Sequence, residues 1–287
     1  MRVLLALLAA SLLAALVHRS SPSGAAPSGL ASAPPPRAWS GSTRRLSYSL
    51  LGSFPHDPSS FTQGLVYSPS TSRLYESAGL YGESSLRLIG TPGTPEQGRV
   101  LQETPVAAEY FAEGISLSPD AREVRMLTWK ERAMLSFDAG TLARAAGEAR
   151  GYRTHTGEGW GLTLLGGDYV ASDGSDTLVT WDGGTMEEKG RVRVRTTDGK
   201  PVRYLNELEA YRGDVLANVW YSDVLLRIEP ASGLVKAVYD FKDLWPRGER
   251  PQTADCFNGI ALLEDDVLLV TGKLWDRYYT VQIEDPD

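Results

Sequence analysis

The sequence predicts an all-β protein with the architecture of a five-bladed β-propeller. A short signature with a polar or aromatic residue returns every 46 to 52 residues along the body of the chain, and a period in that range is typical of propeller blades. Strand-like stretches follow each signature, with hydrophobic residues that alternate with polar ones or run continuously. The 29 glycines supply many turns, such as Asp173-Gly174 and Asp198-Gly199, and long amphipathic runs are few.

Residues 1–19 are expected to be a signal peptide or a signal-anchor. Residues 3–17 are uncharged and largely apolar, which is the length of a signal core and short for a membrane span. Small residues at 31–33 offer a weak cleavage site, whereas His18 and Arg19 directly after the apolar run favour retention. We therefore expect an exported protein, periplasmic or secreted, with membrane anchoring through residues 3–17 as the alternative.

Residues 20–45 are expected to be a flexible linker, because Ser, Pro, Ala and Gly dominate its first part and cannot build a core. The propeller is expected over residues 46–287. Residues 46–54 form an N-terminal strand that could complete the last blade and close the ring, since an open propeller leaves exposed strand edges. The net charge of −7 argues against nucleic acid as a partner, and we expect a monomer.

The elements within each repeat recur in the same order. The five opening signatures are Gln63-Gly64-Leu65, Glu113-Gly114-Ile115, Trp160-Gly161-Leu162, Asn206-Glu207-Leu208 and Asn258-Gly259-Ile260. Second strands are expected at 73–77, 124–129, 168–172, 214–218 and 266–270. Third strands are expected at 85–89, 133–137, 177–181, 225–229 and 279–283. Because the innermost strand of each blade lines the central channel, the opening residues and the ends of the second strands should form one ring.

That ring combines aromatic and polar residues as a binding pocket does. Its second-strand members are Trp129, Trp220 and Lys273. Glu113 lies among aromatic residues, where a carboxyl has a raised pKa and suits a proton shuttle, but a structural role is an equal alternative. Lys273 is a candidate oxyanion donor or a surface lysine. The tryptophans, including Trp160, are candidates for an ammonium cage or ordinary packing.

The sequence gives weaker support to a metal site or to a nucleophilic cysteine. Asn206 and Asn258 are candidates to bind substrate amides, or to form a calcium site with Glu113 and Asp173. The three histidines are far apart without ligand spacing, so we expect neither a catalytic zinc nor another cofactor. Cys256 is the only cysteine, and a buried small side chain is a better interpretation of it than a nucleophile.

Ten short segments resemble the plant-type glutaminyl-peptide cyclotransferases. They follow in collinear order over residues 54–275, as FPHDPSSFTQGL (54–65), ESAGLYGESSLR (76–87), YFAEGI (110–115), LTW (127–129), GWGL (159–162), SDG (172–174), LNELE (205–209), ANVW (217–220), NGIA (258–261) and TGKLW (271–275). The resemblance implies a five-bladed propeller that converts N-terminal glutamine to pyroglutamate with release of ammonia. Peptides or proteins with an N-terminal Gln would be its partners.

By this resemblance, nine residues form the pocket: Phe61, Gln63, Phe111, Glu113, Trp129, Trp160, Asn206, Trp220 and Lys273. Glu113 would take a proton from the α-amine and pass it to the leaving ammonia, and Lys273, Asn206 or an indole N–H would hold the oxyanion. Ala112, residues 130–132 and residues 221–222 depart from the family's usual strings and are expected to affect the rim. Two alternatives remain open, a non-catalytic propeller that binds peptide N-termini and a calcium-dependent, lactonase-like hydrolase.

Overall fold

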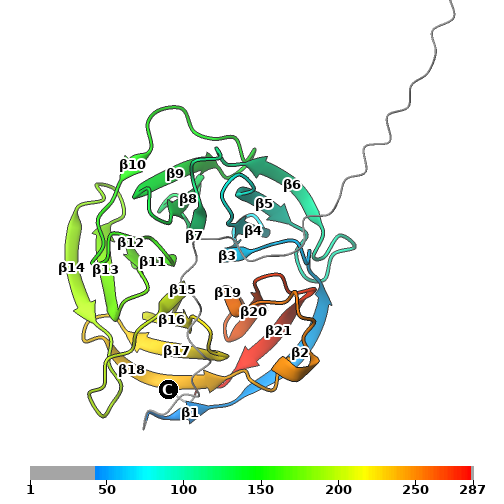
Figure 1. Cartoon of the computed structure of the whole chain (residues 1–287), viewed down its shortest axis with the longest axis vertical. Helices are drawn as coiled ribbons and strands as arrows, with labels where there is room; N and C mark the ends of the chain where they lie inside the picture. Colours follow the sequence, from blue (N-terminus) through cyan, green and yellow to red (C-terminus); the bar gives the residue numbers. More distant parts are fainter. Residues whose placement is uncertain (1–42, 286–287) are drawn as a thin grey trace, which may run out of the picture. The chain divides into compact units, whose positions relative to one another are not determined.

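Residues 43–285 are described by a computed structural model and form a ring of five β-sheets (Figure 1). We call the sheets blades 1 to 5 in chain order. This arrangement confirms the predicted all-β five-bladed propeller. The predicted signal segment, residues 1–19, and most of the predicted linker lie outside the described residues.

Each blade is a meander of antiparallel strands whose first strand is innermost. Blade 1 contains β3 (Thr62–Ser68), β4 (Arg73–Ala78), β5 (Ser85–Ile89) and β6 (Val100–Pro105). Blade 2 contains β7 (Ala112–Leu117), β8 (Glu123–Thr128), β9 (Ala133–Asp138) and β10 (Arg150–Gly151). Blade 3 contains β11 (Leu162–Leu165), β12 (Asp168–Ala171), β13 (Thr177–Asp182) and β14 (Glu188–Arg193).

The last two blades also receive the N-terminal strands β1 (Arg45–Leu46) and β2 (Tyr48–Pro55). Blade 4 contains β15 (Leu205–Tyr211), β16 (Asp214–Val219), β17 (Val224–Glu229) and β18 (Leu234–Asp240), with β1 added outside β18. Blade 5 contains β19 (Phe257–Glu264), β20 (Val267–Gly272) and β21 (Arg277–Ile283), with β2 as its outer strand. A single 3-10 turn, η1 (Arg247–Glu249), connects these two blades in the described part of the chain.

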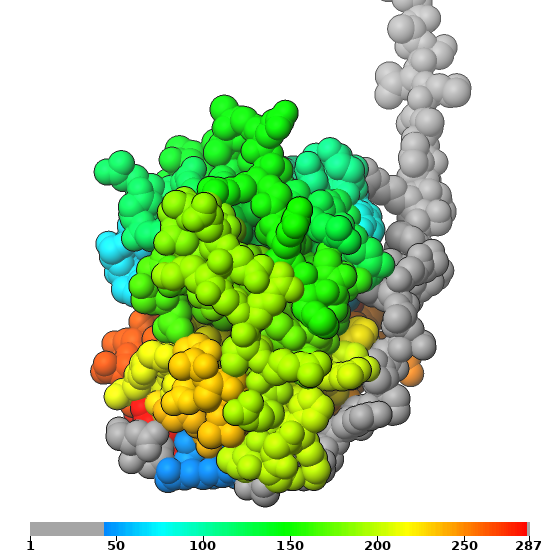
Figure 2. Space-filling view, turned by 90° about the vertical axis from the view of Figure 1, so that its left-hand side faces the viewer, coloured from blue at the N-terminus to red at the C-terminus, as the bar shows by residue number. Residues whose placement is uncertain are grey.

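The N-terminal strands close the ring. β2 pairs with β21 in antiparallel register from Tyr48↔Ile283 to Pro55↔Arg277, which confirms that the N-terminal strand completes the last blade. β1 was not predicted. It pairs in parallel with β18 through Arg45↔Val238, and in Figure 2 this blue segment lies beside the yellow and orange of blade 4. The N-terminal residues therefore tie two neighbouring blades together.

The described hydrophobic core consists of five clusters, and each lies between two neighbouring blades. In one of them Val66 and Tyr75 of blade 1 pack with Ile115 and Val124 of blade 2. Blade faces bury apolar area on both sides, at about 25 cal/mol per Å² of area removed from water. The blades are thus held to one another around the whole ring, which gives the central strands fixed positions.

Glycines at the openings of the repeats let neighbouring inner strands touch backbone to backbone. A Cβ on Gly114 would lie 2.6 Å from the carbonyl oxygen of Trp160, and the Gly114 N–H donates to that oxygen at 2.7 Å. A Cβ on Gly161 would lie 2.1 Å from the carbonyl oxygen of Asn206. Any larger residue would force these strands apart. The close contact brings the opening residues of successive repeats together.

β-Bulges set the direction of the side chains of those opening residues. The pairing of inner and second strands skips between Ala112 and Ile115 in blade 2, and equivalent shifts occur at Gln63, Asn206 and Asn258 in blades 1, 4 and 5. A β-bulge leaves an extra residue unpaired and redirects its side chain, and bulges are common beside active sites. Four of the five opening residues therefore lie at a break in strand pairing.

The fourth repeat has Glu207 where the other four have glycine. Its side chain reaches from blade 4 to blade 1, where Oε1 accepts the backbone N–H of Leu65 at 3.3 Å. Burial raises the pKa of this carboxyl well above its usual range, and Glu209 adds to the rise. Glu207 therefore joins inner strands of opposite blades through hydrogen bonds rather than packing.

Candidate active site

The predicted site residues gather at one end of the ring. Trp129, Trp220 and Lys273 directly follow the second strands β8, β16 and β20, while Gln63 and Glu113 lie at the start of inner strands. Each inner strand is antiparallel to its second strand. The start of an inner strand and the end of its second strand therefore lie on the same face of the propeller. Phe61, Phe111 and Trp160 precede β3, β7 and β11 on that face, and Asn206 lies at the start of β15.

Glu113 is the buried carboxyl of the site, with 5% of its surface exposed. Burial raises its pKa well above the ordinary value, against the opposing effect of Lys273, and the carboxyls of Glu158 and Glu131 raise it further. Its backbone is held in place because the Ser77 hydroxyl donates to the Glu113 carbonyl at 2.7 Å. Glu113 is thus a stronger base, when ionised, than an ordinary carboxylate.

Lys273 is buried rather than on the surface, with 5% exposure, so the surface-lysine alternative is wrong. Its Nζ lies 4.7 Å from the centre of the Phe61 ring. Its backbone N–H donates to the carbonyl of Cys256 at 2.9 Å. Gly272 makes the turn possible, because a Cβ there would lie 2.2 Å from the indole of Trp275. A tight turn therefore holds this ammonium inside the site.

One half of the aromatic wall belongs to blades 1 and 2. The Phe111 ring lies 6.5 Å from Phe61 and 5.5 Å from Trp129 between ring centres. Tyr81 packs edge-on against Phe111 at 5.3 Å and lies 6.4 Å from Trp129. Aromatic pairs at these distances and angles attract each other beyond simple burial. Tyr81 is half exposed and forms the rim of this half.

The other half of the wall belongs to blades 3 and 4, and Glu158 connects the halves. Trp160 packs edge-on against Trp220 at 5.5 Å, and Tyr221 packs against Trp220 at 4.9 Å. The indole N–H of Trp129 and that of Trp160 both donate to Oε2 of Glu158, at 2.9 and 3.0 Å. Because both N–H groups already donate to Glu158, neither is free to donate to the oxyanion. The two indoles are therefore no longer candidates for that role.

Two amides of the predicted pocket are buried, and each has an acceptor that has no hydrogen-bond partner among the described residues. These acceptors are Oε1 of Gln63 and Oδ1 of Asn206, and both side chains are at most 2% exposed. A buried polar atom without a partner costs free energy of about 1–3 kcal/mol. A ligand with N–H groups would supply the missing donors. Oδ1 of Asn258 has no partner among the described residues either, but the amide N–H₂ of Asn258 donates to the carbonyl of Thr62 at 3.0 Å and joins blades 5 and 1.

Of the departures from the family pattern, residues 130–132 lie beside the aromatic wall, whereas Ala112 is fully buried in the core between blades 1 and 2 and not at the rim. Lys130 places its ammonium 3.7 Å from the centre of the Trp129 ring. Glu131 accepts the Tyr81 hydroxyl at 2.7 Å and the Phe111 backbone N–H at 3.4 Å. Glu131 and Arg132 also line a surface hollow of about 630 Å³ on blade 2. The rim thus continues outward from the aromatic wall into a charged hollow.

The other candidates have local roles. Asp173 accepts hydrogen bonds from Thr156 and Ser175 and holds two turns together. Among residues 43–285, no three His, Cys, Asp or Glu side chains come together in a way that would hold a metal ion. Cys256 is free and buried, and burial raises the pKa of its thiol to about 12. This environment agrees with the interpretation of Cys256 as a small core side chain.

Comparisons with known proteins point to one family. The sequence profile of the family described as glutamine cyclotransferase matches residues 24–283. A glutaminyl-peptide cyclotransferase from Arabidopsis thaliana is 35% identical over 255 residues, which is 85% of this chain and 75% of the relative. The crystal structure of a glutaminyl cyclase from Myxococcus xanthus superimposes with a TM-score of 0.72 and 29% identity, over 85% of this chain and 100% of that one.

A more distant match shares the fold alone. The PQQ-bound aldose sugar dehydrogenase from Streptomyces coelicolor superimposes with a TM-score of 0.53 at 12% identity, over 83% of this chain and 98% of that chain.

Proposed function

The chain belongs to the glutamine cyclotransferase family, and from this membership we propose that it converts the N-terminal glutamine of peptides and proteins to pyroglutamate and releases ammonia. The observation that carries the proposal is the buried carboxyl of Glu113, opposed by the buried ammonium of Lys273 within an aromatic wall. In the proposed acyl transfer, the carboxyl would move a proton and the ammonium would stabilise negative charge.

The reaction needs a base whose pKa approaches that of an amine. An N-terminal α-amine has a pKa of about 7.7–8.0, so an ordinary carboxylate takes its proton poorly. Burial raises the pKa of Glu113 toward that range, which improves the proton transfer. Glu131 and Glu158 surround the site with further negative charge, which attracts the ammonium form of the substrate.

The proposed steps balance in atoms and protons. Glu113 accepts a proton from the α-amine as its nitrogen attacks the γ-carboxamide carbon, and a tetrahedral oxyanion forms. The bond between that carbon and the amide nitrogen then breaks, and Glu113 returns the proton so that ammonia leaves. Nucleophile and electrophile belong to one residue, so holding the side chain folded back supplies much of the rate. Glu113 ends the cycle as it began.

Lys273 is the favoured donor to the oxyanion. The indole N–H groups of Trp129 and Trp160 are taken by Glu158, and an ammonium gives a stronger, charge-assisted hydrogen bond than a neutral amide. Gln63 and Asn206 are proposed to accept N–H groups of the substrate through their unpartnered oxygens. The residues that follow the glutamine would lie toward Glu131 and the hollow on blade 2.

A direct assay tests the function. The purified protein is incubated with a peptide that begins with Gln, and the product is followed by mass spectrometry and by ammonia release. The proposal expects loss of one ammonia from this peptide and none from its N-acetylated form, whose nitrogen is not nucleophilic. Binding of the Gln peptide without mass loss would instead support a non-catalytic propeller.

We also propose that the protein is exported by residues 1–19 and acts as a monomer, with a linker that follows residue 19 and ends before β1. The apolar run at 3–17 supports export. Among the described residues, no helix has the length and apolar character needed to cross a membrane. N-terminal sequencing of the protein recovered from cell fractions distinguishes a cleaved signal from a retained anchor, and light scattering measures the mass in solution.

A further inference from the structure

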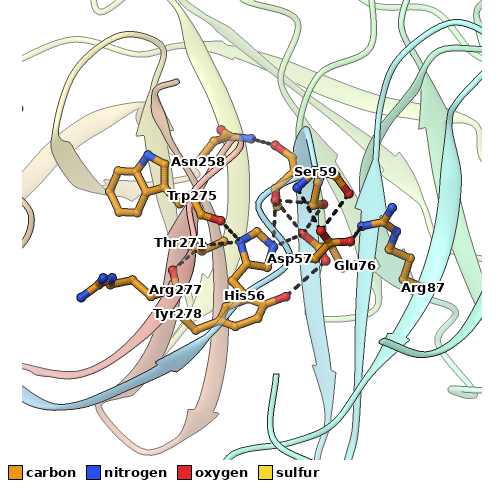
Figure 3. Close-up of polar contacts among 12 residues, drawn as sticks. His56, Asp57, Ser59, Glu76, Arg87, Asn258, Thr271, Trp275, Arg277 and Tyr278 are labelled. Carbon is orange, nitrogen blue, oxygen red and sulfur yellow. Dashed lines mark hydrogen bonds and ion pairs between the residues drawn. The ribbon is translucent and has the colours of Figure 1, made fainter. Parts of the chain in front are cut away.

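A buried ion pair lies just behind the site and takes no part in the steps above. His56 follows β2, and Glu76 lies in β4. Nε2 of His56 lies 2.9 Å from Oε1 of Glu76, and the two side chains are 1% and 0% exposed. Figure 3 shows the pair at the junction of blades 5 and 1, surrounded by hydrogen bonds. A buried charge pair is costly unless its remaining hydrogen bonds are satisfied.

The hydrogen bonds of this pair are satisfied. Nδ1 of His56 lies 2.8 Å from the carbonyl oxygen of Trp275, which can only accept, so Nδ1 carries a hydrogen. Burial raises the pKa of Glu76, but His56 and the hydroxyls of Thr62 and Ser60 outweigh burial and lower the pKa to about 2. Glu76 is therefore ionised, and its oxygens can accept hydrogen bonds from all the groups around it.

Glu76 of this pair accepts hydrogen bonds from the residues on both sides of Phe61. The hydroxyls of Ser60 and Thr62 donate to the same oxygen, Oε1 of Glu76, at 2.8 and 2.6 Å. Because these residues flank Phe61, two charge-assisted hydrogen bonds restrain the backbone that carries its ring. The hydroxyl of Tyr278 donates to the other oxygen of Glu76 at 3.2 Å, which ties blade 5 to the same carboxylate.

Hydrogen bonds also connect the surroundings of this pair to the turn that follows Lys273. The backbone N–H of Leu274 donates to the carbonyl of Ser60 at 2.7 Å, and the carbonyl of Trp275 accepts from His56. Leu274 has a φ of 58°, a backbone conformation that a leucine adopts only when its surroundings hold it there. The segment that carries Lys273 is thus fixed to the segment that carries Phe61.

We propose that the His56–Glu76 pair is a positioning device for cyclisation, which holds the Lys273 ammonium over the Phe61 ring and so within reach of the reacting centre at Glu113. This positioning role rests on the function proposed above for Glu113 and Lys273. His56 and Glu76 are positioning residues, because they act through the two segments they hold and touch neither the substrate nor the reacting atoms.

The titration of Glu113 reports the position of Lys273. Lys273 lowers the pKa of Glu113, whereas Glu158 and Glu131, the other charged groups that face it, raise it. If Glu76→Gln releases the turn and Lys273 moves away, the midpoint of the Glu113 titration rises. The direct effect of removing the negative charge of Glu76 has the opposite sign and would lower it. An upward shift that disappears when Lys273 is also replaced therefore identifies displacement of Lys273.

The experiment compares four proteins: the wild type, Glu76→Gln, Lys273→Met and the double variant. The Glu113 carboxyl carbon is titrated by ¹³C NMR and assigned by its loss in Glu113→Gln, and kcat and KM are measured with a Gln-initiated peptide. We expect Glu76→Gln to raise the Glu113 midpoint in the same direction as Lys273→Met. We expect kcat to fall about 10–100-fold with a smaller change in KM, and the double variant to match Lys273→Met.

A matched control removes a buried ion pair away from the site. Arg227 and Asp214 of blade 4 lie 2.5 Å apart and are 5% and 7% exposed. Asp214→Asn should lower thermal stability but leave the Glu113 midpoint and kcat unchanged. If Glu76→Gln does not fold, Ser60→Ala removes a single donor to Glu76 and should shift the midpoint upward by less.

An unchanged or lowered midpoint in folded Glu76→Gln, or additive effects in the double variant, would overturn the proposal. The NMR titration needs no turnover. A wild type that cyclises no peptide therefore contradicts the proposed function, while the positioning of Lys273 is still decided by the titration.

Discussion

The carboxylate of Glu158 accepts the indole N–H of Trp129 at 2.9 Å, and the same oxygen atom accepts a second indole at 3.0 Å. One side chain thereby joins the two halves of the aromatic wall, one from blades 1 and 2 and the other from blades 3 and 4. Its charge also raises the pKa of Glu113. Glu158 therefore affects both the shape of the site and the strength of its base.

Substitutions at Glu158 should separate these two effects. Glu158→Gln keeps an oxygen that can accept both indoles but removes the charge, so the pKa of Glu113 should fall and the acid limb of the rate profile should move to lower pH. Glu158→Ala also frees the indoles, and KM should rise roughly 10-fold or more, as expected when about 1.4 kcal/mol of binding is lost. Steady-state kinetics across pH measure both. Identical profiles for the two variants would show that the hydrogen bonds to the indoles are unimportant.

Lys273→Met should change the reaction in a different way. The substitution keeps much of the volume and removes the ammonium that lowers the pKa of Glu113. The acid limb should persist and move to higher pH, and kcat should fall roughly 10²–10³-fold, the scale of losing an oxyanion donor. The measurement is kcat as a function of pH. An unmoved limb with normal kcat would place the Lys273 ammonium outside the reacting centre.

Cys256 should be inert in the folded protein. It is buried, and burial raises the pKa of its thiol to about 12, so at pH 8 its thiolate fraction is roughly 10³-fold below that of a free cysteine. Thiol reagents should modify the unfolded chain rapidly and the native protein very slowly, with no loss of activity. Rapid inactivation of native protein by such a reagent would contradict the assignment of Cys256 to the core.

Ring closure by β2 should dominate stability. A chain that begins at residue 43 keeps β1 and β2, whereas a chain that begins at residue 56 loses both strands and leaves β21 as an exposed edge. The shorter chain should lose about 5 kcal/mol or more, comparable to the whole stability of a typical domain. Thermal unfolding by circular dichroism compares them. Equal melting temperatures would mean that the ring holds without its closing strand.

Most of the fold could be predicted from the sequence because inner, second and third strands are buried and carry regular hydrophobic patterns. Apart from β2, the outer strands were not predicted. β6 and β14 are largely exposed, so neither face has to be apolar, and β10 has only two residues. β1 was missed because a two-residue parallel pairing with β18 leaves no pattern in the sequence.

The site residues were predicted through the repeat and the family resemblance, whereas their supporting groups were not. Glu158 lies two residues before Trp160 in a turn, where nothing in the sequence indicates that it meets Trp129. His56 and Glu76 are 20 positions apart, and nothing in the spacing of the histidines indicates that His56 pairs with a carboxylate. Glu207 replaces a glycine in one repeat out of five, and this break in the pattern was the available signal.

The pH dependence of kcat in Glu113→Gln tests the central claim most directly. The substitution keeps the size of the side chain and removes its titration, so kcat should fall roughly 10²–10⁴-fold, the usual scale of general acid–base catalysis. The acid limb due to Glu113 should disappear, KM should change less than kcat, and the melting temperature should stay near that of the wild type. Near-normal kcat with an unchanged pH profile would contradict the account, because the proton would then travel without Glu113.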